Sequence, residues 1–278
     1  MGFYDRYILP PLINCACGAE PIRRQREKIV PQAEGVVLEL GFGAGLNLRH
    51  YDRSKVTKLF ALEPALGMLA RARKVAAHTD LPVEILAETA EALSLPTASV
   101  DTVLVTYSLC TIPDAVAALN GARRALRPGG RLLFCEHGRA PDEAVRRTQA
   151  RIGPVWRIIG GGCRLSRDIP ALIAQGGFAI ETLETMYLPK APAWSGFNYW
   201  GSAKARWRPT RPPIPRCCAP SGGFACWRNS PISAWSWPGF CGQRRAIWAR
   251  ARIRRPNRAA PRNATRRWSS PGSRAPSV

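Results

Sequence analysis

Short apolar runs alternate with longer mixed segments along most of the 278-residue chain. Five of these runs have the length and the flanking turn residues of buried parallel strands. They are Val36–Leu40, Lys58–Glu63, Val83–Leu86, Val100–Thr106 and Arg131–Glu136. Their alternation with expected helices predicts βαβ units and a parallel sheet that is covered on both faces.

The segments between the strands are interpreted as helices. They are Leu46–Tyr51, Ala65–Ala77, Asp114–Leu126, Ala144–Ile159 and Asp168–Gln175. Asp114 has the position and chemistry of an N-cap. Residues 1 to about 30 are also expected to be helical, with breaks at Pro10, Pro11 and Pro21, and to form a cap that packs over a pocket.

Two more strands are expected near the end of this pattern, at Phe178–Tyr187 and Phe197–Ala203. They are close enough in sequence to pair as an antiparallel hairpin at the edge of the sheet. The predicted fold class is therefore α/β and Rossmann-like, with seven strands, most of them parallel. The predicted domain covers residues 1–203.

The pattern stops at residue 204, and the charge changes there as well. The last acidic residue is Glu184, and the segment from Lys204 onward has 17 Lys and Arg and no Asp or Glu. The formal net charge of +22 therefore belongs mainly to this tail. We interpret residues 204–278 as a disordered extension or as GC-rich coding DNA read out of frame. An arm that binds nucleic acid is the less favoured alternative.

Cysteine spacing and hydropathy exclude several other classes. The pairs Cys15/Cys17 and Cys217/Cys218 are too close for the usual zinc motifs, so no metal site is expected. No apolar run is long enough for a transmembrane helix, and the N-terminus lacks the order of a secretory signal. We therefore expect a cytoplasmic protein with reduced thiols, whose apolar N-terminal stretch could touch a membrane surface.

The strongest chemical motif follows the first strand, where Gly41, Gly43 and Gly45 form a glycine turn. Glycines let the backbone approach a ligand where any Cβ would clash. A helix that begins directly behind the turn would offer free N–H groups to a cofactor carboxylate. Leu46 stands where the dinucleotide fingerprint needs its third glycine, which argues against a nicotinamide cofactor.

Glu63 ends the second strand, on the edge of the sheet where open α/β folds bind ligands. A carboxylate there can accept hydrogen bonds from both hydroxyls of a ribose. One βα unit after the glycine turn, Glu63 is the expected ribose ligand.

At this point the chain resembles a known family. The segments VLELGFGAGLNL, FALEPALGML, AETAEALSLPTASVDTVLVTYSLCTI and ALRPGGRLLFCEH are similar to class I methyltransferases of the methyltransferase-11 type. The segments FYDRYILPPLINCACG, PIRRQREKIVPQAEG, GGGCRLSRDIPALI and FNYWG resemble the branch that includes the methyltransferase-like 7 thiol methyltransferases. The resemblance covers residues 3 to 203.

The resemblance implies S-adenosylmethionine as cofactor and assigns residues to its parts. Glu39 and the three glycines would surround its methionine portion, and Glu63 its ribose. Pro64 and Met68 would line the adenosine pocket, and Tyr107 would face the methyl donor. Glu88, Thr89 and Ala90 match the loop that holds adenine. Thr89 stands where many relatives have Asp, so Glu88 or the backbone of Ala90 would make that contact.

The sequence identifies no catalytic base. His137 ends the fifth strand and could take a proton from the acceptor, but a His in a merely structural role fits equally well. The expected reaction is methyl transfer to a small, hydrophobic acceptor, with a thiol as one candidate. The alternative is a nucleic-acid-binding protein that uses the tail and has the Rossmann-like part as scaffold. The oligomeric state is left open.

Overall fold

The computed structural model describes residues 3–206, and the interpretations of the basic tail fall on residues 207–278, outside that range. The N-terminal part is helical, as expected. It contains the π-helix η1 (Tyr4–Ile8), the helices α1 (Leu9–Cys17) and α2 (Glu20–Ile29), and the 3-10 turn η2 (Val30–Gln32). Pro10 and Pro11 lie within the first turn of α1, where a missing N–H costs nothing, and they do not interrupt it.

The rest of the described chain alternates strands with helices. The strands are β1 (Gly35–Leu40), β2 (Val56–Leu62), β3 (Val83–Leu86), β4 (Val100–Thr106), β5 (Leu126–His137), β6 (Phe178–Tyr187) and β7 (Phe197–Ala205). The helices and turns between them are η3 (Leu48–His50), α3 (Leu66–Ala76), η4 (Ala90–Ala92), α4 (Ala115–Ala125), α5 (Glu143–Ile159), α6 (Ile169–Gln175) and α7 (Ala193–Gly196).

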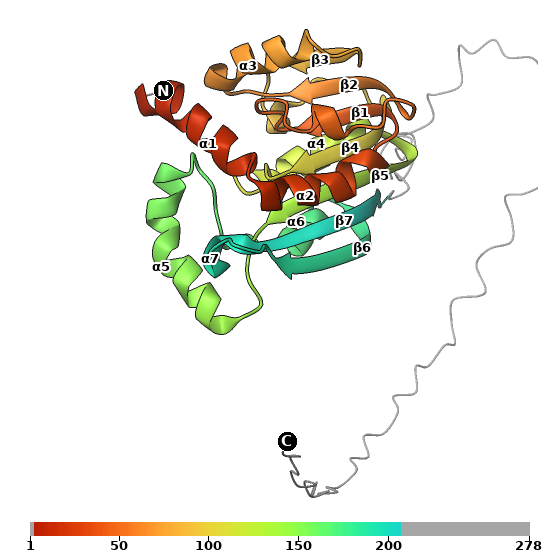
Figure 1. Cartoon of the computed structure of the whole chain (residues 1–278). Helices are drawn as coiled ribbons and strands as arrows, with labels where there is room; N and C mark the ends of the chain where they lie inside the picture. The colour runs from red at the N-terminus through yellow and green to blue at the C-terminus, as the bar shows by residue number, and fades with distance from the viewer. Residues whose placement is uncertain (1–2, 207–278) are drawn as a thin grey trace, which may run out of the picture. The chain divides into compact units, whose positions relative to one another are not determined.

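The seven strands form one sheet in the order β3-β2-β1-β4-β5-β7-β6 (Figure 1). Neighbours from β3 to β5 are parallel, and β7 pairs antiparallel with both β5 and β6. The predicted fold class, with its C-terminal antiparallel pair, is therefore confirmed. The order reverses between β1 and β4, and open α/β sheets bind ligands beyond the carboxyl ends of the strands at such a point.

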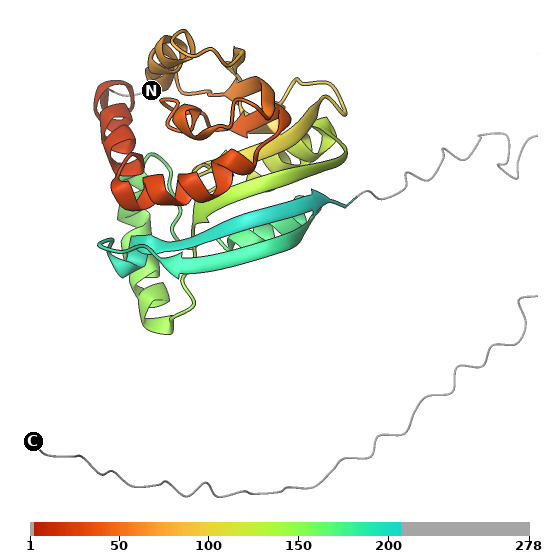
Figure 2. The same ribbon diagram turned by 45° about the vertical axis from the view of Figure 1, so that its right-hand side comes forward.

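Helices cover both faces of the sheet and make two separate cores. One core packs α4 and α6 on one face, through residues such as Leu119 and Ile173. The other core packs α2 and α3 on the opposite face, through Ile29 and Ala72. Figure 2 shows α2 running across the front of the sheet and α1 standing at the left, beside the ends of the strands. No helix among the described residues is both long and apolar enough to cross a membrane.

The segment after the glycine turn differs from the prediction. Leu46–Tyr51 was expected to open a helix, but it holds only turns and the three-residue η3. Asn47 and Tyr51 both hydrogen-bond to the buried carboxylate of Glu39, at 2.8 and 2.6 Å. These bonds keep the segment folded against the end of β1, so there is no helix N-terminus here to bind an anion.

Candidate active site

A cavity of about 640 Å³ opens where the strand order reverses. Its wall includes the glycine turn after β1, the end of β2 and the segment after β4. Leu9 and Ile13 of α1 also line it, in keeping with the expectation that the N-terminal stretch packs over a pocket. The volume lies within the range of about 300–1,000 Å³ that is usual for small-molecule sites.

The glycines of the turn adopt a backbone that other residues avoid. Gly41, Gly43 and Gly45 have φ of +76°, +59° and +77°. A Cβ on Gly41 would lie 2.2 Å from Ser108 Oγ, whereas one on Gly43 would meet nothing within 4 Å. Gly41 therefore allows β1 and β4 to end in close contact, and Gly43 leaves free space on the cavity wall.

Glu63 joins the turn to the end of β2. Its Oε2 accepts a hydrogen bond from the backbone N–H of Gly43 at 2.7 Å, and its Oε1 accepts one from Ala65 at 2.8 Å. Burial raises the pKa of the Glu63 carboxyl, and these two amides partly oppose that shift. Each carboxylate oxygen keeps a second lone pair, so Glu63 can support the turn and still accept ligand hydroxyls.

Eight of the eleven predicted cofactor residues lie on the cavity wall. They are Gly41, Gly43, Glu63, Pro64, Met68, Thr89, Ala90 and Tyr107. Glu39, Gly45 and Glu88 do not line it. Glu88 accepts a hydrogen bond from Ser94 N at 3.0 Å, while its neighbour Glu91 reaches the wall.

Glu39 lies behind the wall, where the residue is only 1% exposed and its carboxylate anchors Asn47 and Tyr51. Burial raises the pKa of the Glu39 carboxyl to about 7, against the opposing effects of Tyr51, Arg26 and Asn47. The structure therefore places Glu39 where it can order the turn rather than touch a ligand.

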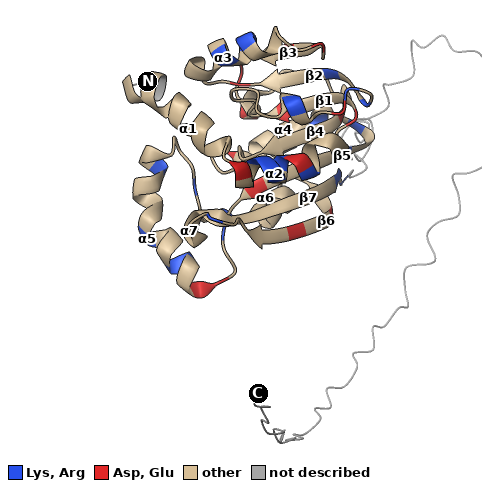
Figure 3. Ribbon diagram, in the orientation of Figure 1, with Lys and Arg blue, Asp and Glu red and all other residues tan. Residues whose placement is uncertain are grey.

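Arg26 is a charged wall residue that the sequence did not reveal. Figure 3 shows basic and acidic residues along α2. Arg23 and Arg24, the neighbours of Arg26 in this helix, pair with Glu27 and Glu20 on the outside. Arg26 instead turns inward, is 6% exposed and donates to Asn47 Oδ1 and Thr106 Oγ1 at 2.7 and 2.6 Å.

The guanidinium of Arg26 also lies 5.2 Å from the centre of the Tyr107 ring, and its buried Nε has no hydrogen-bond partner among the described residues. A cation that lines the cavity fits a ligand that carries a carboxylate.

Tyr107 itself has φ of +54°, a conformation that non-glycine residues rarely adopt. Its backbone N–H bonds to Cys135 O at 2.9 Å, and the next residue, Ser108, donates its N–H to the buried Glu136 at 2.7 Å. These contacts fix the strained turn after β4 on the cavity wall.

His137, the candidate base, does not line the cavity. Its Nε2 lies 3.2 Å from Cys163 Sγ, and its ring makes a further hydrogen bond with the backbone of Ser195. Both contacts hold the His137 ring away from the cavity wall.

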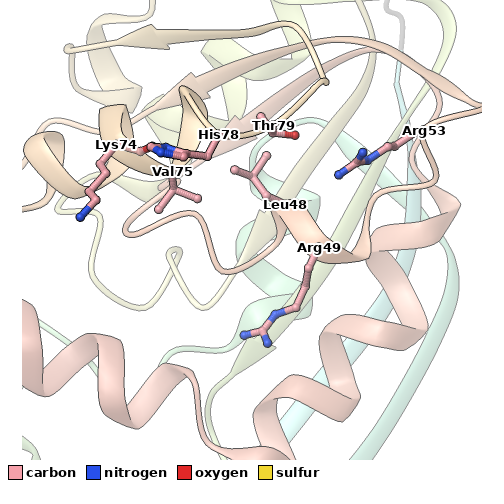
Figure 4. Close-up of a pocket in the computed structure, with 7 residues that line it drawn as sticks. All are labelled: Leu48, Arg49, Arg53, Lys74, Val75, His78 and Thr79. Carbon is pink, nitrogen blue, oxygen red and sulfur yellow. The ribbon is translucent and has the colours of Figure 1, made fainter.

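A second, smaller hollow lies between η3 and α3 (Figure 4). Arg49, Arg53, Lys74 and His78 make its wall basic, and Arg53 pairs with Asp80 at 2.8 Å. None of the predicted cofactor residues belongs to it. The larger cavity is therefore the candidate active site.

Comparisons with known proteins agree with this location. A family model described as a methyltransferase domain matches residues 38–134, which include the glycine turn, Glu63 and Tyr107. The chain is similar to thiol S-methyltransferase TMT1B of Rattus norvegicus, with 31% identity over 153 residues. That match covers 54% of this chain and 63% of the rat protein, so the chain spans less than two thirds of that relative.

The name of a second relative gives a different methyl acceptor. The phosphatidylethanolamine N-methyltransferase of Cereibacter sphaeroides is 33% identical over 139 residues, which is 48% of this chain and 67% of that protein. Among solved structures, a SAM-dependent methyltransferase from Leishmania major has a similar fold, with a TM-score of 0.54 at 16% identity. The superposition covers 72% of this chain and 80% of that structure.

Proposed function

We propose that this chain transfers a methyl group from S-adenosylmethionine to a small, hydrophobic acceptor. The premise is that the chain belongs to the methyltransferase-11 family of S-adenosylmethionine-dependent methyltransferases. The observation that carries the proposal is the cavity at the reversal of the strand order, with Glu63 and Arg26 on its wall. Their chemistry complements two separate parts of the cofactor.

Glu63 is the residue expected to hold the ribose. Its carboxylate is fixed by two backbone amides and faces the cavity with unused lone pairs. Ribose hydroxyls are donors, and hydrogen bonds to an ionised acceptor are stronger than those between neutral groups. The neighbouring Pro64 and Met68 supply apolar wall for the adenosine.

Arg26 is the residue expected to hold the carboxylate of the methionine portion. Asn47 and Thr106 hold its Nη1, and Arg26 also lines the cavity. This assignment replaces the helix N-terminus that the sequence predicted as the carboxylate site. It also gives Glu39 an indirect role, because Asn47 bridges Glu39 to Arg26.

S-adenosylmethionine supplies an electrophilic methyl group on a sulfonium when it is bound. The chain's own contribution is placement and exclusion of water. Leu9 and Ile13 of α1 close the cavity from outside, and Phe42 and Ile112 make more of its wall apolar. Holding acceptor and donor in line inside such a site removes much of the entropic barrier.

A thiol is the acceptor that this wall suits best. Among the described wall residues, the carboxylates are Glu63 and Glu91, and both already accept backbone N–H groups. Glu63 is also the expected ribose ligand, which leaves Glu91 as the one other carboxylate base among the described wall residues. A thiol is partly ionised near neutral pH and needs no general base. The rat relative, a thiol S-methyltransferase by name, supports the same choice.

The nucleic-acid alternative rests on residues 204–278, nearly all of which lie outside the described range. The cavity and the matched methyltransferase family give it no support.

The proposal is tested by incubating the full-length protein with methyl-labelled S-adenosylmethionine and three acceptors. These are a hydrophobic alkyl thiol, a phenol of similar size and vesicles of phosphatidylethanolamine. We expect label to enter the thiol fastest, and the Glu63→Ala variant to be inactive with all three. Transfer mainly to the phenol or the lipid would contradict the thiol assignment. If the protein binds S-adenosylhomocysteine but methylates none of the three acceptors, the result would contradict this acceptor class.

A further inference from the structure

Three metal-ligating side chains meet at the end of the sheet beside the cavity. Cys110 follows β4, His137 ends β5, and Cys163 lies in the turn between α5 and α6. Their ligand atoms all lie within 4.8 Å of one another, and Cys163 Sγ is 3.2 Å from His137 Nε2. We call these residues the Cys110–His137–Cys163 cluster.

These distances are close to those of a metal site. In tetrahedral zinc sites the Zn–S and Zn–N bonds are about 2.3 and 2.0 Å, which puts donor atoms roughly 3.5–3.8 Å apart. The cluster needs only small side-chain adjustments to reach this geometry. Two sulfurs and one imidazole also form a donor set that soft transition metals prefer over magnesium or calcium.

The surroundings favour a metal complex without net charge. Cys110 and Cys163 are 4% and 7% exposed, and they pack with Leu165, Trp156 and Trp194. Burying an unbalanced charge there would be costly. Two thiolates and a neutral imidazole balance the double positive charge of zinc, so the complex as a whole can be buried.

The backbone around the cluster is already held in place. Arg164 donates its N–H to Cys110 O at 2.9 Å, which joins the α5–α6 turn to the segment after β4. The backbone of Ser195 hydrogen-bonds to the His137 ring. Zinc-bound histidines usually have such a second partner, which orients the ring toward the metal.

We propose that the Cys110–His137–Cys163 cluster binds a zinc ion. The ion joins the turn between α5 and α6 to the ends of β4 and β5, next to the cavity wall at Gly161 and Thr111. Three protein ligands leave one tetrahedral position for water or another soft ligand, as in catalytic zinc sites.

The test uses full-length protein purified under reducing conditions, freed of metal with a chelator and titrated with Co²⁺ and then Zn²⁺. We expect about one equivalent of metal per chain, with a thiolate-to-cobalt charge-transfer band that zinc abolishes. Cys110→Ser and Cys163→Ser should each weaken binding at least about tenfold and reduce this band. His137→Gln should weaken binding but leave the thiolate band.

Matched controls separate the cluster from the other cysteines. Cys15→Ser removes an exposed thiol, and the double variant Cys217→Ser/Cys218→Ser removes a pair in the tail. Both should bind metal like the parent protein. Far-ultraviolet circular dichroism shows whether each variant is folded. The proposal is overturned if folded parent protein binds no metal, if the cluster variants bind it unchanged, or if protein purified under reducing conditions contains a Cys110–Cys163 disulfide.

Discussion

Gly41 and Gly43 form a natural pair for testing how the glycine turn is built. Both have positive φ, so alanine at either position costs about 1–2 kcal/mol of backbone strain. Only Gly41 adds a clash, because its new Cβ would lie 2.7 Å from Ser108 Cβ as well as near Oγ. Rotation about χ1 can move Ser108 Oγ away, but it cannot move Cβ.

Overpacking of this kind costs about 1–3 kcal/mol. We therefore expect Gly41→Ala to lower the free energy of unfolding by about 2–5 kcal/mol and Gly43→Ala by about 1–2 kcal/mol. In a chain of this size, each kcal/mol shifts Tm by about 2–4 °C. Urea denaturation and thermal melts measure both quantities.

The double variant Gly41→Ala/Ser108→Gly shows whether Ser108 is the cause. It removes the clash and leaves the backbone strain, so it should be more stable than the sum of the two single changes predicts. Equal losses in Gly41→Ala and Gly43→Ala, or strictly additive losses in the double variant, would refute the reasoning.

Three further predictions concern binding and local stability. In calorimetry, the affinity for S-adenosylhomocysteine should fall as the pH drops through a value above 4.5, because burial raises the pKa of Glu63 and only its carboxylate accepts both ribose hydroxyls. Glu63→Gln should bind weakly and without this pH dependence. Arg26→Gln should weaken S-adenosylhomocysteine about 10–150-fold but leave adenosine unchanged, since only the former carries a carboxylate; equal losses for both would contradict the assignment. Asp114→Ala should lower the free energy of unfolding by about 1 kcal/mol in urea denaturation, because Asp114 Oδ1 accepts the N–H of Ala117 at 2.9 Å and caps α4. Asp114→Asn should keep most of the stability, and equal stability of all three proteins would exclude this cap.

Much of the sheet follows directly from the sequence. The bounds of β3, β4 and β6 agree with their predicted runs, because apolar residues bounded by turn residues define each strand. The segment after Gly45 does not follow from the sequence, because its conformation depends on the hydrogen bonds of Asn47 and Tyr51 to Glu39. That contact exists only once β1 is buried.

The site was predictable where it follows local motifs and not where it depends on distant segments. The glycine turn and Glu63 come from one βα unit and its successor. Arg26 looked like one more cation on a charged helix, and its burial is set by Asn47 and Thr106, which are far away in sequence. Cys110 and Cys163 are likewise brought together only by the tertiary fold.

The central claim is that Glu63 and the glycine turn hold S-adenosylmethionine, and calorimetry with S-adenosylhomocysteine tests it most directly. The parent protein should bind the ligand, and Glu63→Ala should lose at least about tenfold in affinity, as expected for a charged hydrogen-bond acceptor. Glu88→Ala is the matched control, because Glu88 lies off the cavity wall, and it should bind like the parent protein. Absence of binding by folded parent protein, or undiminished binding by folded Glu63→Ala, would contradict the account.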